Sequence, residues 1–584
     1  MPNWGNLSAA LALLAAGGLF TSAAPAQETE LPRLQSITER PIPWQSDWTM
    51  TGGPGQDWSI AWHGWRPELM ARVNGESIIS LIEREDTEQA PSGLGLAQTV
   101  EGVWVGYRNK MPERGVYVER VGHQERVRPI NISEDALPLA RLQLHAHQDQ
   151  IRATWYGERR GDNGTEYHIH YREFSKDGDL GAQHANLLPG IYPVWINDPS
   201  GRMAIFSWVV DQDGSRIETR RRLTDGGFDE AATIRETSRE ITLPFGSFIS
   251  GNRWFVYWVA QYGGGSDYLI EGAYSDDYGK SWTDFDLEAM RGLGIESVAV
   301  EGDGERITVA LGVEDPSHPR RGHSTVKIIQ SEDNGKTWGD LQSVRDEEAF
   351  GYARSRSPHL ARLDDDHLLL IWEDWREIRS RVRYSLSSDG GKTWDVRDGR
   401  LAVGDEHNVM LNLSANAIQV LDDGRVLIAK EYMQDPFDTK MLKVMHTDLA
   451  SLGQPDSELK PTTDDLKARQ DAYWEAMINE DFRAGYELLD PFYRARIPFR
   501  EHLRSMGRVE YEEAEIKDME AQGHVAMTRS RVRAGVPEFS TEHGETVTVP
   551  MDDRSVDLRW VWVDGDWYVE YFSEGRGGIR FTRH

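Results

Sequence analysis

The chain of 584 residues contains no cysteine. Disulfides, thiolate zinc sites, cysteine nucleophiles and iron–sulfur clusters are therefore excluded, so packing and hydrogen bonding must stabilise the fold. Positive charge is also scarce, because 65 Lys and Arg stand against 96 Asp and Glu and the formal net charge is −31. The electrostatic field of this negative charge repels phosphate backbones, so we predict no nucleic-acid partner.

Long apolar runs are scarce as well, and the one candidate for a signal peptide or membrane anchor lies at the start of the chain. Residues 1 to 26 carry no charged side chain, and an apolar run from Leu7 to Phe20 precedes Ala24-Pro25-Ala26. This pattern predicts a signal peptide cleaved after Ala26, and hence an exported, periplasmic or secreted protein. An uncleaved anchor is the alternative, but the run is shorter than the roughly 20 residues that span a bilayer. We therefore predict no membrane span after cleavage.

What the chain does contain is a repeat. Three segments align without gaps to the pattern S-x-D-x-G-x-[S/T]-W, and weaker copies begin at Ser175 and Thr224. The positions that recur in the three segments are Ser275, Asp277, Gly279 and Trp282; Ser331, Asp333, Gly335 and Trp338; and Ser387, Asp389, Gly391 and Trp394.

The chemistry of the repeat favours a hairpin turn. Asp and Ser side chains bind nearby backbone N–H groups, Gly adopts positive φ, and the Trp is expected to fold back over its own hairpin. Burying one Trp would contribute roughly 4–6 kcal/mol of gross stabilisation. A calcium loop is the alternative, but the bidentate Glu that closes an EF-hand loop is missing, so we predict no metal there.

Short alternating or apolar runs surround each copy, as expected for consecutive antiparallel strands. Comparable units begin near residues 95, 137, 190, 245, 294 and 412, and a further unit is indicated at 44 to 90. Four short strands per unit in radial repetition predict a mainly β protein built on a β-propeller of six to eight blades.

The three repeats resemble Asp boxes, and residues 45–455 are similar to the sialidase (neuraminidase) family of Asp-box propellers. The resemblance implies an exo-glycosidase pocket on the face opposite the boxes, a carbohydrate or glycoconjugate partner, and no cofactor. The alternative is a non-catalytic propeller that binds glycan or protein, because a fold does not fix a function.

Carried onto this chain, the resemblance implies Tyr432 as nucleophile, with Asp374 or Glu158 as the acid. Glu373 is the preferred partner of Tyr432, because Glu431 is adjacent on the strand and must point to the other face. The implied substrate-binding arginines are Arg356, Arg376, Arg160, Arg321 and Arg108.

Two further features bear on the resemblance and on a possible metal site. The Arg-Ile-Pro motif expected near the start of a sialidase propeller is replaced by Arg40-Pro41-Ile42-Pro43, and the literal Arg496-Ile497-Pro498 lies far downstream. His145 and His147 share one strand face, as metal ligands can, but no third ligand is evident. We predict neither a metal nor a cofactor.

The chain changes character after the propeller. Residues 456–463 lie in a polar linker, and 464–584 are assigned to a second unit. Helical spacing covers Leu466 to Ile478, a second helix is predicted from Phe482 to Tyr493, and four strands follow. This order resembles the SnoaL-like (nuclear transport factor 2-like) α+β cone fold. The resemblance implies a binding or assembly module, including a homodimer through this unit, with an isomerase as the alternative.

Overall fold

The structure is a computed structural model. It describes residues 35–42, 48–52, 58–63, 69–73, 77–82, 92–99, 101–109, 114–121, 129–133, 137–161, 164–211, 214–237, 239–262, 268–314, 324–344, 355–375, 381–394, 396–401, 410–413, 417–433, 440–452, 462–506, 509–522, 524–540, 546–563 and 565–570. The predicted signal peptide, residues 1–26, lies outside these ranges.

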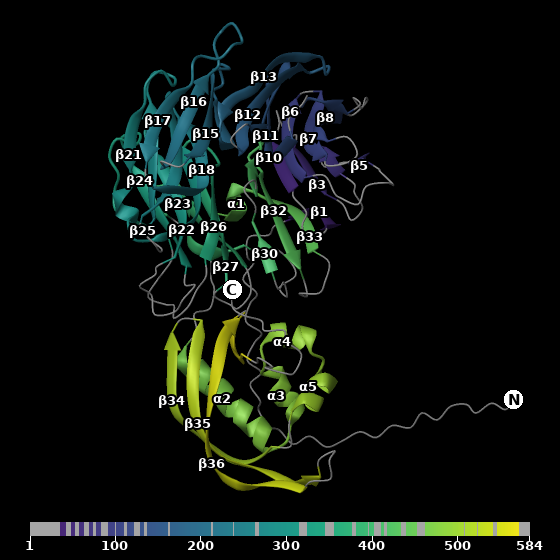
Figure 1. The fold of residues 1–584 in the computed structure, drawn as a ribbon. Coiled ribbons are helices and arrows are strands. Elements are labelled where there is room, and N and C mark those ends of the chain that lie inside the picture. Colours follow the sequence, from purple (N-terminus) through teal and green to yellow (C-terminus); the bar gives the residue numbers. More distant parts are fainter. Residues whose placement is uncertain are drawn as a thin grey trace, which may run out of the picture.

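Nine antiparallel sheets are present among the described residues, and eight of them are blades of a β-propeller (Figure 1). The strands of the first four blades are β2 (Trp48–Gly52), β3 (Trp58–His63), β4 (Leu69–Val73) and β5 (Ser77–Ile82); β6 (Ser92–Thr99), β7 (Gly102–Asn109), β8 (Gly115–Val121) and β9 (Ile130–Asn131); β10 (Leu137–His147), β11 (Gln150–Gly161), β12 (Gly164–Ser175) and β13 (Leu180–Pro189); and β14 (Ile191–Asn197), β15 (Met203–Asp211), β16 (Gly214–Arg221) and β17 (Ala232–Thr237).

The remaining blades follow in chain order. Their strands are β18 (Glu240–Ser250), β19 (Arg253–Gln261), β20 (Tyr268–Ser275) and β21 (Thr283–Asp286); β22 (Gly294–Gly302), β23 (Ile307–Glu314), β24 (Ser324–Ser331) and β25 (Gln342–Ser343); β26 (Ser355–Arg362), β27 (Leu368–Asp374), β28 (Arg381–Ser387) and β29 (Val396–Arg400); and β30 (Met410–Asn412), β31 (Ile418–Val420), β32 (Val426–Met433) and β33 (Lys440–Thr447). A short 3₁₀ helix, η1 (Glu288–Met290), joins the fifth blade to the sixth.

An early strand closes the ring. β1 (Gln35–Ile42) pairs antiparallel with β33 and is the outermost strand of the eighth blade. Contacts between β31 and β2 join that blade to the first. The predicted unit at 44–90 is the first blade, so the predicted fold class is confirmed, with eight blades.

The core lies between the blades, where each buries the faces of its sheet against its two neighbours. Leu368, Leu370 and Trp372 of β27 pack with Val326 and Ile328 of the preceding blade. The opposite face of β27 presents Leu369 and Ile371 to the cluster that contains Leu427 and Ile428 of the eighth blade. The continuous apolar runs in these strands therefore reflect burial on both faces.

Each of the three repeats forms the predicted turn, between the third and fourth strands of its blade. The Ser331 hydroxyl oxygen accepts a hydrogen bond from the Gly335 backbone N–H at 2.7 Å, and one Asp333 carboxylate oxygen accepts from Lys336 and Thr337 N–H at 3.0 and 2.8 Å. The same bonds recur at Asp277 and Asp389. The weaker copies at Ser175 and Thr224 also follow third strands. We call this side of the propeller the box end.

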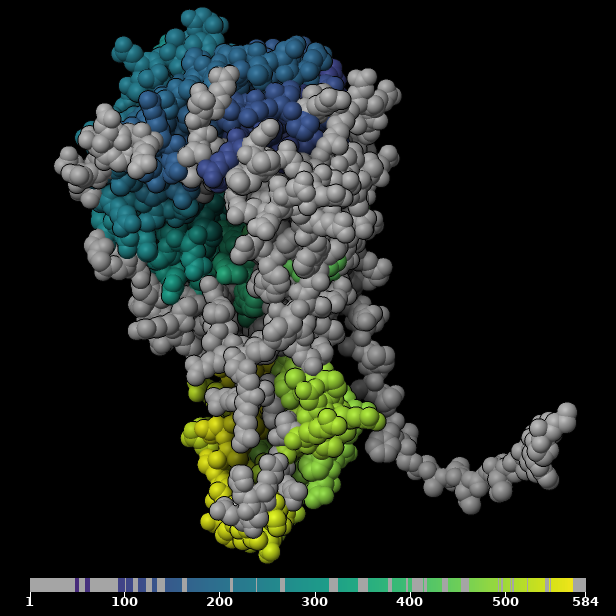
Figure 2. Space-filling model, turned by 45° about the vertical axis from the view of Figure 1, so that its right-hand side comes forward, coloured from purple at the N-terminus to yellow at the C-terminus, as the bar shows by residue number. Residues whose placement is uncertain are grey.

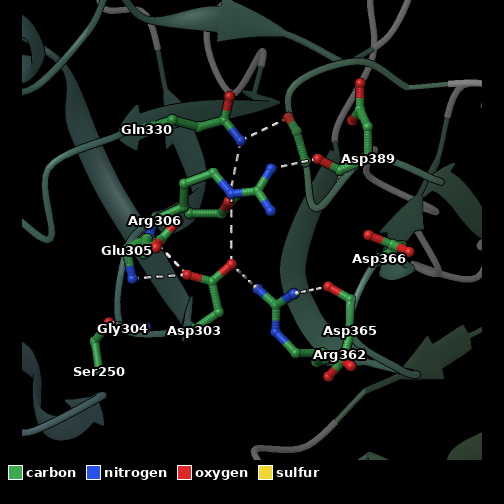
Figure 3. A network of polar contacts seen from close by, with 12 residues as sticks. Ser250, Asp303, Gly304, Glu305, Arg306, Gln330, Arg362, Asp365, Asp366 and Asp389 are labelled. Carbon is green, nitrogen blue, oxygen red and sulfur yellow. Dashed lines mark hydrogen bonds and ion pairs between the residues drawn. The ribbon is translucent and has the colours of Figure 1, made fainter.

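The residue before the central glycine of each repeat adopts a left-handed conformation, with φ of 60° at Tyr278, 56° at Asn334 and 70° at Gly390. An arginine of the preceding blade contacts each of these turns. Arg253 donates to the Asn334 carbonyl, and Arg306 donates to the Asp389 carbonyl. Figure 3 shows the second of these contacts within a network that also joins Asp303 to Arg306 and Arg362. The turns therefore tie neighbouring blades together.

The tryptophans of the repeats do not fold over their own hairpins. Trp282 meets the Phe206 ring of the preceding blade edge-on at 5.4 Å, and Trp338 stacks on Phe285 of the preceding blade at 6.2 Å. Trp394 is buried in the cluster that includes Val326 of the blade before it. The predicted intra-hairpin packing is wrong, because the gap between blades buries more apolar surface than a single hairpin can offer.

The second unit combines helices with the ninth sheet, whose strand order is β34-β35-β36-β37. Its elements are α2 (Thr463–Ile478), α3 (Phe482–Glu487), α4 (Pro491–Arg496), α5 (Phe499–Ser505), β34 (Glu510–Gln522), β35 (Val525–Ser540), β36 (Thr546–Val563) and β37 (Asp566–Val569); α1 (Leu449–Leu452) follows β33. The predicted single helix from Phe482 to Tyr493 is wrong. Asp490 caps a new helix by accepting from Tyr493 N–H at 2.8 Å, and Pro491 occupies its first turn.

α2 packs on the sheet through Leu466, Gln470, Trp474 and Met477, which recur at helical spacing. Figures 1 and 2 place this green-to-yellow unit beyond the end of the propeller where β27 and β30 are labelled. No helix among the described residues is both long and apolar enough to cross a membrane.

Candidate functional site

The side opposite the box end carries the connections between second and third strands; we call it the open end. Six of the eight innermost strands are irregular near their start at this end, including β14 between Ile191 and Val194, β18 between Thr242 and Phe245, and β26 between Arg356 and His359. Bulges change the direction of side chains and are common beside active sites. The local chain therefore departs from regular strand geometry at the end where the resemblance places a pocket.

Arg356 and Glu373 form the first polar cluster at the open end. The Glu373 side chain is fully buried, and one of its oxygens accepts from Arg356 Nε and Nη2 at 3.1 and 2.9 Å. The Trp375 indole donates to the same oxygen at 2.5 Å. A buried carboxylate is stable only when it is paired and hydrogen-bonded, as here. The predicted clamp arginine and the predicted carboxylate therefore bind each other.

Asp374 points away from Glu373, because successive residues of a strand face opposite sides. It is 1% exposed and accepts from the Ser355 hydroxyl at 2.6 Å and from the Trp372 indole at 3.3 Å. The two predicted carboxylates thus face different blade interfaces.

Tyr432 is 2% exposed in β32. Its ring lies 5.2 Å from Lys430 Nζ and 5.9 Å from Lys443 Nζ. Glu431 faces the other side of the strand, where it accepts from the Trp48 indole at 2.8 Å and pairs with Lys440 at 2.6 Å. Among the described contacts, none joins Tyr432 to Glu373, so their predicted partnership stays a prediction.

The other predicted site residues lie in earlier blades or outside the residues that the structure describes. Glu158 is half-buried in β11, and Arg108 lies in β7. Burial lowers the pKa of Arg108, while the nearby Tyr156 and Glu158 raise it, so these groups are neighbours. The backbone of Arg160 belongs to β11, but its side chain is not described. Arg376 and Arg321 lie outside the described residues.

The structure shows a second polar cluster at the open end, around Tyr262 and Glu271 of the fifth blade. The Tyr262 hydroxyl donates to Glu271 Oε1 at 3.0 Å, and the Trp258 indole donates to Oε2 at 3.1 Å. Glu271 is fully buried, whereas Tyr262 is only half-buried. A phenol with an accessible edge therefore has a fixed carboxylate as its acceptor.

Arginines surround this pair. Arg239 donates to Glu271 Oε1 and lies over the Tyr262 ring at 3.6 Å, and Arg291 lies over the same ring at 4.7 Å. Burial raises the pKa of the Tyr262 phenol, Glu271 raises it further, and Arg239 and Arg291 lower it; the net shift is upward. The phenol is thus protonated at neutral pH, with Glu271 placed to receive its proton.

Only half of this cluster can be predicted from the sequence. Tyr262 follows a second strand, so its position at the open end was predictable from the repeat. Glu271 lies inside β20, where it pairs in register with Trp258 and Asp286. An isolated Glu in a strand gives no signal of function, and only the packing of three strands brings it to Tyr262.

The histidines weighed as metal ligands lie in β10. Burial and the nearby Arg152 lower the pKa of His145 to about 4, and its ring meets Trp195 edge-on at 6.0 Å. Within the described part of the chain, no group of three or more His, Asp or Glu side chains is placed to hold a metal ion.

The chain matches no protein-family model and no curated protein. Several solved structures are similar to it. Polysaccharide lyase Uly1 is 11% identical, with a TM-score of 0.41, and the match covers 64% of this chain and 93% of that protein. The GH93 α-L-arabinofuranosidase of Fusarium graminearum is 12% identical, with a TM-score of 0.27 and coverage of 44% and 93%. Trypanosoma rangeli sialidase is 9% identical, with a TM-score of 0.33 and coverage of 92% and 91%. At these scores the likenesses concern the fold alone.

Proposed function

We propose that the chain is a sialidase-like exo-glycosidase whose catalytic pair is Tyr262 and Glu271. The observation that supports this proposal is the 3.0 Å hydrogen bond from the Tyr262 hydroxyl to a fully buried carboxylate, with two guanidinium groups over the ring. A tyrosine paired with a carboxylate can serve as a glycosidase nucleophile.

The reaction would proceed by two displacements. Tyr262 Oη attacks the anomeric carbon and transfers its proton to Glu271 as the glycosidic bond breaks, while a carboxylic acid protonates the leaving oxygen. Water then attacks the same carbon and gives its proton to the carboxylate left by the acid, the carbon–Tyr262 bond breaks, and Glu271 returns its proton to the phenolate. Glu158 is the proposed acid, because Asp374 is buried and bound by Ser355 and Trp372.

Tyr432 of the eighth blade, the nucleophile that the resemblance implies, is the second candidate. The experiment that separates the two sites is fluorophore release from a panel of 4-methylumbelliferyl glycosides by residues 27–584 and by the variants Tyr262→Phe and Tyr432→Phe. We expect Tyr262→Phe to lose turnover and Tyr432→Phe to keep it. Loss in Tyr432→Phe alone would move the nucleophile to the eighth blade, and equal turnover in all three proteins would reject both tyrosines.

A non-catalytic glycan-binding propeller is the alternative, because buried ion pairs between strands also occur in purely structural networks. Absence of turnover on every glycoside, with retained glycan binding, would favour it.

The proposal includes export, which rests on the pattern in residues 1–26 and is tested by determining the amino terminus of the mature protein. It also assigns the second unit to binding or assembly, a role that light scattering of 27–584 against 27–455 examines.

A further inference from the structure

The arginines of both open-end clusters are already paired with carboxylates. Arg291 binds Glu288 through two nitrogens at 2.8 and 2.9 Å, and Arg356 binds Glu373 in a similar way. Arg235 lies 2.7 Å from Asp286 and 3.8 Å from Asp284. Around Tyr262, three arginines therefore face four carboxylates: Arg235, Arg239 and Arg291 against Glu271, Glu288, Asp284 and Asp286.

This balance argues against a clamp for an anionic sugar. A substrate carboxylate at Arg239 would lie close to Glu271, which is fully buried and already accepts a hydrogen bond from that arginine. Like charges at short range in a partly desolvated site repel strongly. The chain as a whole carries a formal charge of −31, which adds long-range repulsion. Uncharged hydroxyls avoid both costs, because each can donate to a carboxylate and accept from an arginine.

A row of aromatic side chains lies at the open end in the third and fourth blades. The Tyr156 ring of the third blade lies 5.7 Å from that of Tyr192 in the fourth, and Tyr192 stacks on Trp208 at 5.8 Å. Tyr192, Trp208 and Tyr262 pack against one buried cluster that contains Phe245 and Trp258. The row and Tyr262 therefore share one buried cluster of the fourth and fifth blades.

The backbone at Tyr192 is held in an uncommon conformation. Its φ is 53°, it precedes Pro193, and it lies in the irregular start of β14. Left-handed backbone is costly for an aromatic residue and is found mainly where the surroundings require it, often at ligand sites. Here it directs the Tyr192 ring between Tyr156 and Trp208.

We propose that the substrate is an uncharged glycan chain, and that sugar units beyond the cleaved one bind along the row Tyr156, Tyr192 and Trp208. Aromatic rings pack against the apolar faces of neutral sugars, and a few polar groups fix their orientation. This inference rests on the proposed function for the position of the cleaved unit, but its binding component does not require turnover.

The test is affinity electrophoresis of residues 27–584 carrying Tyr262→Phe, which separates binding from turnover. The gels contain the neutral polymers arabinan, xylan or galactan, or the acidic polymers polygalacturonate or polysialate. We expect at least one neutral polymer to retard the protein, with no loss at high salt because no charge pairing is involved. Tyr192→Ala should weaken that binding about two- to tenfold. Leu223→Ala, which changes an exposed apolar side chain at the box end, is the control and should leave that binding unchanged.

Retardation by acidic polymers alone, or by no neutral polymer, would overturn the inference. Equal binding by the Tyr262→Phe protein with and without Tyr192→Ala, at the same thermal unfolding midpoint, would also overturn it. Because Tyr192→Ala can also disturb β14, Tyr156→Leu provides a second variant in another blade, and its binding should fall as well. If residues 27–584 with Tyr262 intact bind a neutral polymer but hydrolyse no glycoside, the proposed hydrolysis is rejected and this inference stands.

Discussion

Replacing Glu271 by glutamine tests the electrostatic core of the proposed site without relying on turnover. The change preserves the shape of the side chain but removes the charge that accepts from Tyr262, Trp258 and Arg239. Breaking a buried ion pair by removing one partner costs about 3–5 kcal/mol. Arg239 is 35% exposed and Arg235 keeps Asp286, so we expect a loss below this range, about 2–3 kcal/mol.

The same substitution should lower the pKa of Tyr262. Glu271 contributes to the upward shift of that phenol through its charge and its hydrogen bond, and Arg239 and Arg291 oppose it. Removing the carboxylate leaves only burial to raise the pKa against both guanidinium groups. The Tyr262 ring would then ionise at lower pH in Glu271→Gln than in the parent.

Two measurements check these expectations: urea unfolding for stability, and ¹³C-tyrosine NMR for the pKa, with the Tyr262 signal assigned by its absence in Tyr262→Phe. Glu288→Gln is the control, because Glu288 is exposed and pairs with Arg291 rather than with Tyr262. It should leave the unfolding midpoint unchanged. An unchanged or raised Tyr262 pKa in Glu271→Gln would refute the assignment of this pair.

Two further predictions concern the propeller. Ser331→Ala leaves the buried Gly335 N–H without its acceptor, so we expect a loss of about 1–3 kcal/mol in urea unfolding, whereas exposed Glu332→Ala in the same turn should change nothing. Equal stability of the two variants would refute the role of the turn. Burial raises the pKa of Glu301 to about 7 against the influence of Arg362. The folded state then keeps a proton that the unfolded state releases, so stability should fall as pH rises from about 4.5 to about 7. Glu301→Gln should flatten that decline and exposed Glu305→Gln should not; an identical pH profile for the parent and Glu301→Gln would contradict the shift.

Local patterns were sufficient to predict the blades. The alternating runs mark strands because a sheet has a period of two, and the repeat marks a turn because Ser and Asp side chains bind backbone N–H groups within four residues. These bonds involve only neighbours in sequence, as at Ser331 and Gly335. Contacts between blades could not be predicted from local patterns. For this reason the sequence did not predict where the tryptophans of the repeats pack.

The candidate site was predictable only in outline. The repeat places Arg356, Glu373 and Tyr432 near the open end, since strand parity and blade order follow from the chain itself. It could not show that Arg356 and Glu373 bind each other, because that pair depends on the bulge in β26 and on the register with β27. Nor could it connect Glu271 to Tyr262, because the position of Glu271 depends on the register between β19 and β20.

The sequence alone determined the class of the fold, the repeating unit and the excess of negative charge, because periodicity, turn chemistry and charge are local or additive properties. The tertiary structure decided the closure by β1, the contacts of the tryptophans with preceding blades, and the pairing of Arg239 and Arg356 with buried carboxylates. These features join residues that are distant in the sequence. They depend on which surfaces bury the most apolar area and which charges must be neutralised together, and neither is written in any single segment of the chain.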